Sequence, residues 1–248
     1  MSFFANALSA ALDSVWPRAC EVPGCGRRSD RPGRHICSSC FAALPVASGS
    51  ACSRCGRVFP GGGPVAFVCD ECLARPTSSF DRACHAVVYA PPADMLLQAF
   101  KFRGARHLGP DFADLLEGAV RSRLPSGEID AVVPVPLHPS RMRKRGYNQS
   151  AIVSELLASR LDRVSLPTAL RRTRATGHQA RKSRRERLES LKNAVEASNP
   201  RLLRGRTVLL VDDVATTFAT LEECARALKA AGAARVWAAT VACAGGES

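Results

Sequence analysis

From about Arg82 onwards, short apolar runs alternate with longer segments in which apolar residues recur every three or four positions. Uninterrupted apolar runs predict buried strands, and the longer spacing predicts amphipathic helices. The expected strands cover 84–89, 129–135, 207–211 and 235–242, and the expected helices cover 94–102, 110–124, 148–161 and 220–231. This alternation indicates an α/β fold, a parallel sheet flanked by helices. Ligands of such sheets bind beyond the carboxyl ends of the strands.

The first part of the chain has a different pattern of apolar and polar residues. Positions 1–16 place Phe3, Phe4, Leu8 and Leu12 on one face of an amphipathic helix. Residues 17–76 have few apolar periods and are rich in Gly, Pro and Ser, and a linker is expected over Ala74–Asp81. We therefore expect an N-terminal helix over 1–16, a small Cys-rich domain over 17–76 and the α/β domain over 82–248.

The sequence gives no sign of a membrane segment. It has no run of about eighteen uncharged apolar residues, which a spanning helix would need. The first residues lack the basic region of a secretory signal peptide. These features favour a cytoplasmic protein without a transmembrane segment.

Nine of the eleven cysteines lie in the first 84 residues, and eight of them form close pairs. Three pairs have C-x2-C spacing and the first has C-x4-C spacing, which is typical of zinc knuckles. The alternative, a disulfide scaffold, suits exported chains and is disfavoured here. All-cysteine ligation predicts structural zinc ions, two if successive pairs share a metal, although an interleaved arrangement stays open at this point. The proposed ligands are Cys20, Cys25, Cys37, Cys40, Cys52, Cys55, Cys69 and Cys72.

The segment Val208–Thr220 carries the most specific chemistry. A buried strand ends in two adjacent acids, small hydroxylated residues follow, and a helix is expected from Thr220, where Thr220 and Glu223 have the spacing of a capping box. Acids suit ribose hydroxyls, and N–H groups at a helix N-terminus suit a phosphate. The candidate sugar-phosphate residues are Asp212, Asp213, Ala215, Thr216, Thr217, Phe218, Ala219 and Thr220.

The net charge of +13 is concentrated, since fourteen Lys or Arg residues and three acids lie between Arg141 and Arg187. Such clustering favours an anionic partner, polyphosphate or nucleic acid, over a merely solvated surface. After the strand at 129–135, a proline-stiffened basic turn suits a pyrophosphate, although an exposed basic loop is the alternative. Its candidate residues are Leu137, His138, Arg141, Arg145 and Gly146. A second basic stretch, 171–193, is interpreted as a lid or as a solvated helix, with Gln179, Lys182, Arg184 and Arg187 as its candidate residues.

Taken together, these segments resemble the ComF family of competence-associated, phosphoribosyltransferase-like proteins. The matching stretches are the cysteine pairs, Phe80–Asp81, Phe100–Gly104, Pro134–His138, Arg145–Gln149, Gln179 with Lys182–Arg184 and Glu186–Arg187, and Val211–Val214. The resemblance implies a type I phosphoribosyltransferase domain behind a double zinc ribbon. It also implies binding of phosphoribosyl pyrophosphate (PRPP) with magnesium, and handling of incoming single-stranded DNA with other DNA-uptake proteins. By that analogy Asp212 and Asp213 hold the ribose hydroxyls, and residues 215–220 hold the 5′-phosphate.

Two departures from the family pattern limit this analogy. Phe218 stands where glycine is usual, and we expect backbone strain and crowding by its ring to weaken PRPP binding. Thr216 stands where purine-salvage relatives have an acid, so transfer to purines is not supported. Two functions therefore stand side by side: a phosphoribosyltransferase with an unidentified acceptor, or a single-stranded-DNA-binding module with weak or no transferase activity. An aromatic content of 6% argues against an extensive base-stacking surface.

Overall fold

The computed structural model describes residues 18–59, 67–75, 77–174 and 193–244. The helix predicted over 1–16 and the four candidate lid residues lie outside this part of the chain. Within it, no helix is long and apolar enough to cross a membrane.

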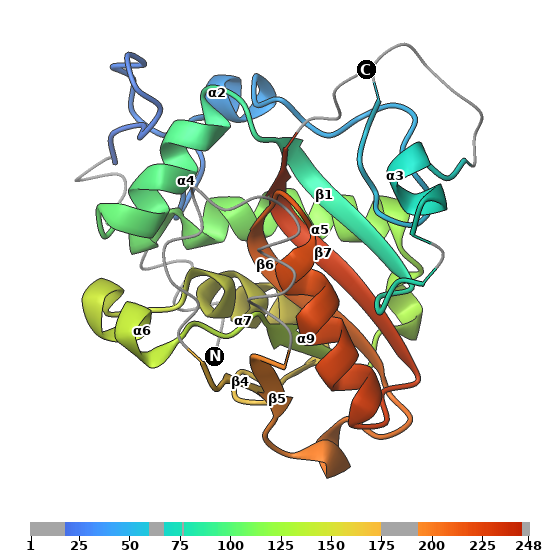
Figure 1. Cartoon of the computed structure of the whole chain (residues 1–248). Coiled ribbons are helices and arrows are strands. Elements are labelled where there is room, and N and C mark those ends of the chain that lie inside the picture. Colours follow the sequence, from blue (N-terminus) through green and yellow to red (C-terminus); the bar gives the residue numbers. More distant parts are fainter. Residues whose placement is uncertain (1–17, 60–66, 76, 175–192, 245–248) are drawn as a thin grey trace.

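A five-stranded sheet forms the centre of the larger domain, in the order β1-β7-β6-β2-β3 (Figure 1). Every pairing in this sheet is parallel, which confirms the expected α/β class. The strands are β1 (Arg82–Val88), β2 (Ala131–Pro134), β3 (Val164–Ser165), β6 (Thr207–Ala215) and β7 (Arg235–Cys243). Valine, leucine and alanine fill β6 and β7, because both faces of these central strands are covered.

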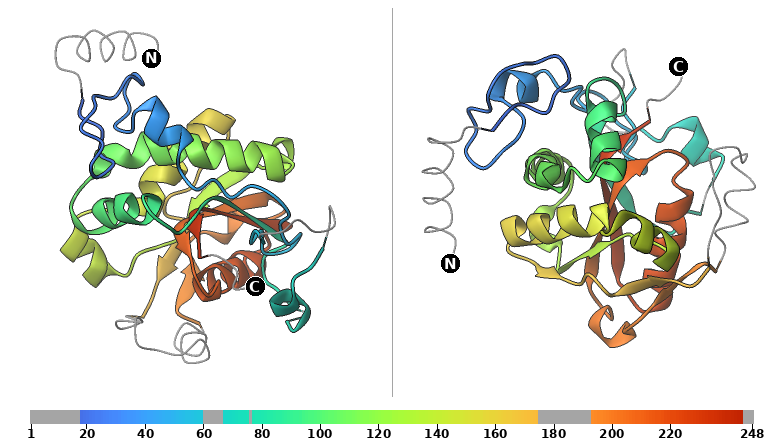
Figure 2. Two further views of the ribbon diagram at one scale, coloured as in Figure 1. Left: turned by 90° about the horizontal axis from the view of Figure 1, so that it is seen from above. Right: turned by 90° about the vertical axis from the view of Figure 1, so that its left-hand side faces the viewer.

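Helices cover both faces of the sheet (Figure 2). On one face lie α4 (Ala93–Phe102), α5 (Gly109–Arg123) and α7 (Gln149–Leu161), which share an apolar core with Leu209, Val211 and Trp237. On the other face lies α9 (Ala219–Ala230), whose Leu221, Cys224 and Leu228 pack on Val208 and Leu210. The shorter elements are α2 (Ser38–Ala42), α3 (Asp70–Leu73), α6 (Pro139–Arg145), and the 3-10 turns Arg106–Leu108, Ser126–Glu128 and Pro200–Leu202. The result is a three-layer arrangement around two apolar cores.

Three features differ from the sequence-based expectations. β6 continues to Ala215, so Asp212 and Asp213 lie within the strand and not after it. The basic turn contains the short helix α6, because His138 caps its first turn and Gly146, with φ 75°, ends it. The basic stretch at 171–193 begins within β4 (Leu170–Arg172) and ends just before β5 (Val195–Ala197), and these two short strands pair in antiparallel fashion.

The Cys-rich segment packs against the larger domain through charged groups. Arg31 Nη1 lies 2.7 Å from Asp111 Oδ1, and Arg31 Nη2 lies 2.7 Å from Asp114 Oδ2. Arg34 and Arg160 also pair with Asp114. Because the Asp111 side chain is fully buried, these arginines compensate a charge that would otherwise be costly to bury.

Candidate functional site

The eight paired cysteines form two separate sets of four. Their sulfur atoms lie within 4.8 Å of one another in each set, which groups Cys20, Cys25, Cys37 and Cys40 together, and Cys52, Cys55, Cys69 and Cys72 together. Successive pairs therefore share a site, and the interleaved alternative is wrong. Backbone N–H groups approach one sulfur of each set at 3.4 Å, as expected for thiolates that carry negative charge. Four clustered thiols without an open position fit a structural zinc ion at each site.

The zinc knuckles are shaped by glycine and by a buried histidine. Gly26 and Gly56 follow the second cysteine of their pairs and have φ of 63° and 71°, which L-residues rarely adopt. The imidazole of His85 on β1 lies with Nε2 2.7 Å from the Cys55 carbonyl oxygen and with Nδ1 2.7 Å from Thr240 Oγ1. Since a carbonyl only accepts, Nε2 carries the proton that it donates to Cys55. Strand β1 of the sheet therefore contacts the Cys52–Cys55 pair of the second cysteine set directly.

A cavity of about 130 Å³ opens where β2 stops beside β6. The last pair between these strands joins Pro134 to Val211, and β6 then runs four residues further. The helices that follow the two strands, α7 and α9, lie on opposite faces of the sheet. A crevice of this kind, at the carboxyl ends of neighbouring strands, is the usual ligand position in parallel α/β sheets. The lining residues are Lys101, Val135, Pro136, Leu137, Arg141, Arg145, Gln149, Ser150, Arg172, Asp212, Asp213 and Thr220.

The two acids of this cavity have different partners. Asp212 Oδ1 accepts hydrogen bonds from the Ser150 hydroxyl at 2.8 Å and from the Asp213 N–H at 2.9 Å. The Asp213 carboxylate pairs with Lys101, whose Nζ lies 2.9 Å from Oδ1. Burial, and then the negative charge of Asp213, raise the pKa of Asp212 to about 7, against the opposing charge of Lys101. The charge of Asp212 therefore changes near neutral pH.

Cations outnumber acids around the cavity. Arg172 on β4 is only 9% exposed, and its Nε has no hydrogen-bond partner among the residues that the structure describes. Burial and the neighbouring charges of Arg172 and Arg145 lower the pKa of Arg141. Like charges held together in this way favour an anion between them. A buried guanidinium nitrogen without a partner suits phosphate oxygens in particular.

The structure brings together six of the predicted site residues: Leu137, Arg141, Arg145, Asp212, Asp213 and Thr220 line the cavity. His138 and Gly146 do not line it, and instead begin and end α6, which presents the two arginines. Thr216 is exposed and Thr217 half-buried in the turn Ala215–Thr220 between β6 and α9. This turn places the N-terminus of α9 at the same end of β6 as the acids.

Phe218 has a left-handed backbone conformation typical of glycine, and its buried ring does not line the cavity. It adopts φ 60°, and it stands directly before α9 without a side-chain cap, so the expected capping box of Thr220 and Glu223 is wrong. Glu223 instead pairs with Arg226. The Phe218 ring is 3% exposed and packs on Phe80, with 6.2 Å between the ring centroids. The expectation that this ring crowds the site is therefore wrong as well.

Comparison with known proteins agrees with this architecture. The chain is 33% identical to competence protein F of Haemophilus influenzae over 79% of this chain and 91% of that protein. The chain belongs to the ComF family. DNA utilization protein YhgH of Escherichia coli K12 is 34% identical over 81% of this chain and 87% of its own length. Competence protein ComFC of Bacillus subtilis is 31% identical over 82% of each. A double zinc ribbon model matches residues 11–73, and a phosphoribosyl transferase domain model matches residues 148–248.

For this ComF protein, sequence reasoning missed four polar residues of the cavity: Lys101, Gln149, Ser150 and Arg172. Lys101, Gln149 and Arg172 lie in stretches singled out for their basic charge or for the family resemblance, but no role was derived for them. Ser150 gave no signal, because a serine at the second position of a helix has no distinctive spacing. Lys101 and α6 also precede residues 148–248, so part of the cavity wall lies outside the transferase model.

Proposed function

We propose that this protein binds PRPP, or a closely related sugar phosphate, in the cavity at the end of β6. The observation that carries the proposal is the juxtaposition of the Asp212–Asp213 pair with the buried guanidinium of Arg172, whose Nε has no hydrogen-bond partner among the described residues. The two carboxylates would accept the ribose hydroxyls. Backbone N–H groups of 215–220 and the hydroxyls of Thr216, Thr217 and Thr220 would hold the 5′-phosphate at the N-terminus of α9. Arg141, Arg145 and Arg172 would neutralise the pyrophosphate.

Magnesium fits the same cavity in this proposal. The Asp212 and Asp213 carboxylates and the Ser150 hydroxyl provide oxygen atoms, which magnesium prefers, and these residues would hold the ion. The ion supplies charge neutralisation for the departing pyrophosphate. In the proposed transfer, an acceptor atom forms a bond to ribose C1 while the C1–O bond breaks with its electrons going to pyrophosphate. Thr216 provides no base at the position that purine transferases use, so the acceptor is not proposed to be a purine.

Calorimetric titration with PRPP and magnesium tests the binding proposal. Arg172→Ala should weaken binding by about tenfold or more, because it removes a charge-assisted contact, whereas Arg172→Lys should restore part of the affinity. Arg201→Ala is a matched control, since Arg201 is exposed on the turn Pro200–Leu202. Equal affinities for the wild type and Arg172→Ala would contradict the proposed pyrophosphate position. Pyrophosphate release on addition of candidate acceptors would then distinguish an active transferase from a PRPP-binding protein.

The cellular role that we propose is DNA uptake in the cytoplasm. The relatives named above are competence and DNA utilization proteins, and they match most of this chain. We further propose that the protein works with other proteins of DNA uptake. A transformation assay with a gene deletion, complemented by wild-type or Asp213→Asn protein, tests whether the cavity is needed for this role.

A second candidate function is the binding of single-stranded DNA. The observation that favours it is a further cationic cavity, beside the first, that contains an exposed aromatic ring. In this reading the transferase fold would serve as a binding module, and phosphate contacts would make the affinity strongly salt-dependent. Binding of an oligonucleotide that persists in the Asp212→Asn and Asp213→Asn variants would support this function.

A further inference from the structure

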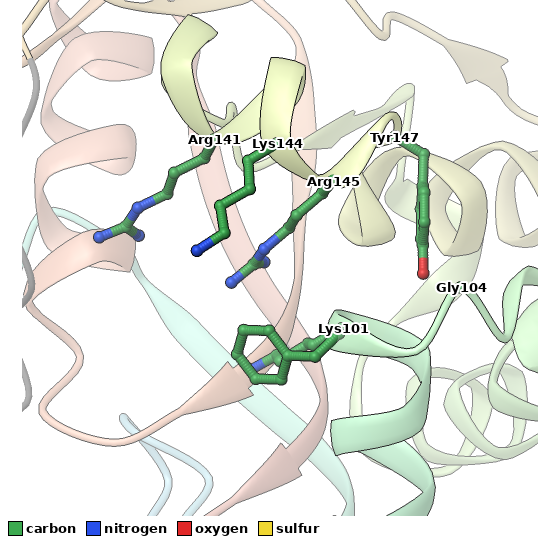
Figure 3. A pocket seen from close by; sticks show the side chains of 7 residues that line it. Lys101, Gly104, Arg141, Lys144, Arg145 and Tyr147 are labelled. Atoms are coloured by element: carbon green, nitrogen blue, oxygen red, sulfur yellow. The ribbon is translucent and has the colours of Figure 1, made fainter.

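A second cavity, of about 280 Å³, lies between the end of α4 and α6. Lys101, Phe102, Gly104, Arg141, Lys144, Arg145 and Tyr147 line it. The side chains of Lys144 and Arg145 extend from α6 toward Lys101, and that of Arg141 extends from the same helix to one side of them, as Figure 3 shows. Four of the lining residues are cations and none is an acid. The charge of the wall therefore selects an anionic ligand.

Phe102 adds an exposed aromatic surface to this cationic cavity. It is the last residue of α4 and is 69% exposed, in a chain whose other described phenylalanines are buried or half-buried. The guanidinium carbon of Arg145 lies 4.8 Å from the centroid of the Phe102 ring. Aromatic rings and guanidinium planes are the surfaces on which nucleobases stack. The cavity thus combines a flat apolar surface with several positive charges.

Hydrogen bonds and a cation–π contact connect the segments that form the wall of this cavity. The Tyr147 hydroxyl donates a hydrogen bond to the Phe100 carbonyl oxygen, which joins the segment after α6 to α4. The guanidinium carbon of Arg106 lies 4.3 Å from the Tyr147 ring centroid, and Arg106 Nη2 donates to the Gly146 carbonyl at 2.8 Å. These contacts connect the segment after α6 to α4 and to the turn Arg106–Leu108. A ligand would therefore meet a site that is already formed, at a low ordering cost.

We propose that this cavity binds one nucleotide of single-stranded DNA, with the base stacked on Phe102 and its phosphate held by Arg141 and Lys144. A nucleotide matches both properties of the site, since it joins a planar ring to an anion at short range. An acidic peptide offers the charge but places a planar group beside it only through a particular sequence. The inference rests on the second candidate function above and gives that function a location.

The position of the site relates it to the first cavity. Lys101, Arg141 and Arg145 line both cavities, so the two share one wall. DNA bound at Phe102 would therefore lie directly beside the ribose-phosphate cavity. Phe102 and Lys144 do not line the first cavity, so substitutions of these two residues test the nucleotide site separately from PRPP, whereas Arg141 belongs to both cavities.

Fluorescence anisotropy with a labelled oligothymidylate tests the proposal on the full-length protein. Phe102→Ala should weaken binding about tenfold, as expected for the loss of one stacked base, and Phe102→Trp should retain it. Lys144→Ala should weaken binding and reduce its salt dependence. Leu202→Ala and Arg201→Ala are matched controls, since both residues are exposed on the turn after β5. An abasic oligomer of equal length should bind weakly and should not respond to Phe102→Ala.

The outcomes separate this inference from the function on which it rests. If wild-type protein binds no oligothymidylate, both fail. If it binds, but Phe102→Ala and the abasic oligomer make no difference, the DNA-binding function stands and the nucleotide site is overturned. Tighter, Phe102-dependent binding of an acidic peptide that contains phenylalanine would also overturn it. Binding of free thymidine monophosphate as tightly as the oligomer would support the site and identify a free nucleotide as its ligand.

Discussion

The centroid of the Phe218 ring lies 5.7 Å from that of the His85 imidazole, in a cluster that also contains Phe80 and the guanidinium of Arg57. Phe218 belongs to the turn before α9, whereas His85 belongs to β1 and hydrogen-bonds the carbonyl oxygen of the zinc knuckle residue Cys55. The residue that departs from the family pattern thus connects the turn before α9 to the second cysteine set. Its side chain has a packing role, while its backbone keeps the conformation that a glycine would have.

Replacing Phe218 by glycine should destabilise the fold more than it changes ligand binding. The substitution relieves about 1–2 kcal/mol of left-handed backbone strain, but it removes a buried ring, for which truncation costs about 3–5 kcal/mol. The net loss should be about 2 kcal/mol of unfolding free energy, measured by denaturant titration. PRPP affinity should stay within about threefold, well under the tenfold that corresponds to 1.4 kcal/mol. A large gain in PRPP affinity would show that the turn is distorted by phenylalanine.

Zinc content should follow the two cysteine sets. The wild-type protein should carry two zinc ions per chain, one for each set. Cys20→Ser and Cys52→Ser should each lose one, whereas Cys84→Ala, at a buried cysteine outside both sets, should keep both. Native mass spectrometry gives these counts. Chelation should lower the melting temperature, because the second set packs in the core with Phe80 and Phe218. A single zinc ion in the wild type would contradict the two-site arrangement.

The ion pair that joins the Cys-rich segment to α5 should contribute strongly to stability. Arg31→Ala would leave the fully buried Asp111 carboxylate without its closest cation, which should cost about 3 kcal/mol. Arg171→Ala is the control, because its pair with Glu196 is exposed on both sides and should be worth under about 1 kcal/mol. Equal effects of the two substitutions in denaturant titrations would show that the buried contact does not hold the segment in place.

PRPP affinity should fall as the pH drops through neutrality. The raised pKa of Asp212, about 7, means that its carboxyl is increasingly protonated below that pH and loses an acceptor for ribose hydroxyls. Lys101→Ala should move the transition to higher pH, because the charge of Lys101 lowers this pKa. Asp212→Asn is the control: only the titration of the ligand phosphates should remain in its profile. Identical pH profiles for the wild type and Asp212→Asn would contradict the assigned role.

Much of the architecture could be predicted from local patterns, and the failures have physical causes. Apolar runs identified the central strands, and the close pairs identified both cysteine sets, because these signals repeat along the sequence. The direction of the Phe218 ring could not be predicted, since it depends on Phe80 and His85, which are remote in the chain. Lys101 and Arg172 were missed for the same reason: only the fold brings α4 and β4 beside the end of β6. Contacts between distant segments decided what sequence spacing could not.

PRPP binding at the end of β6 is tested most directly by a calorimetric titration of PRPP with magnesium into wild-type, Asp212→Asn and Asp213→Asn proteins of equal zinc content. The wild type should bind PRPP saturably and each variant should lose about tenfold or more in affinity, since each substitution removes charge-assisted contacts to the ribose. Absence of binding by the wild type, or binding by both variants at wild-type affinity, would contradict the proposal that the cavity at the end of β6 holds a phosphorylated pentose.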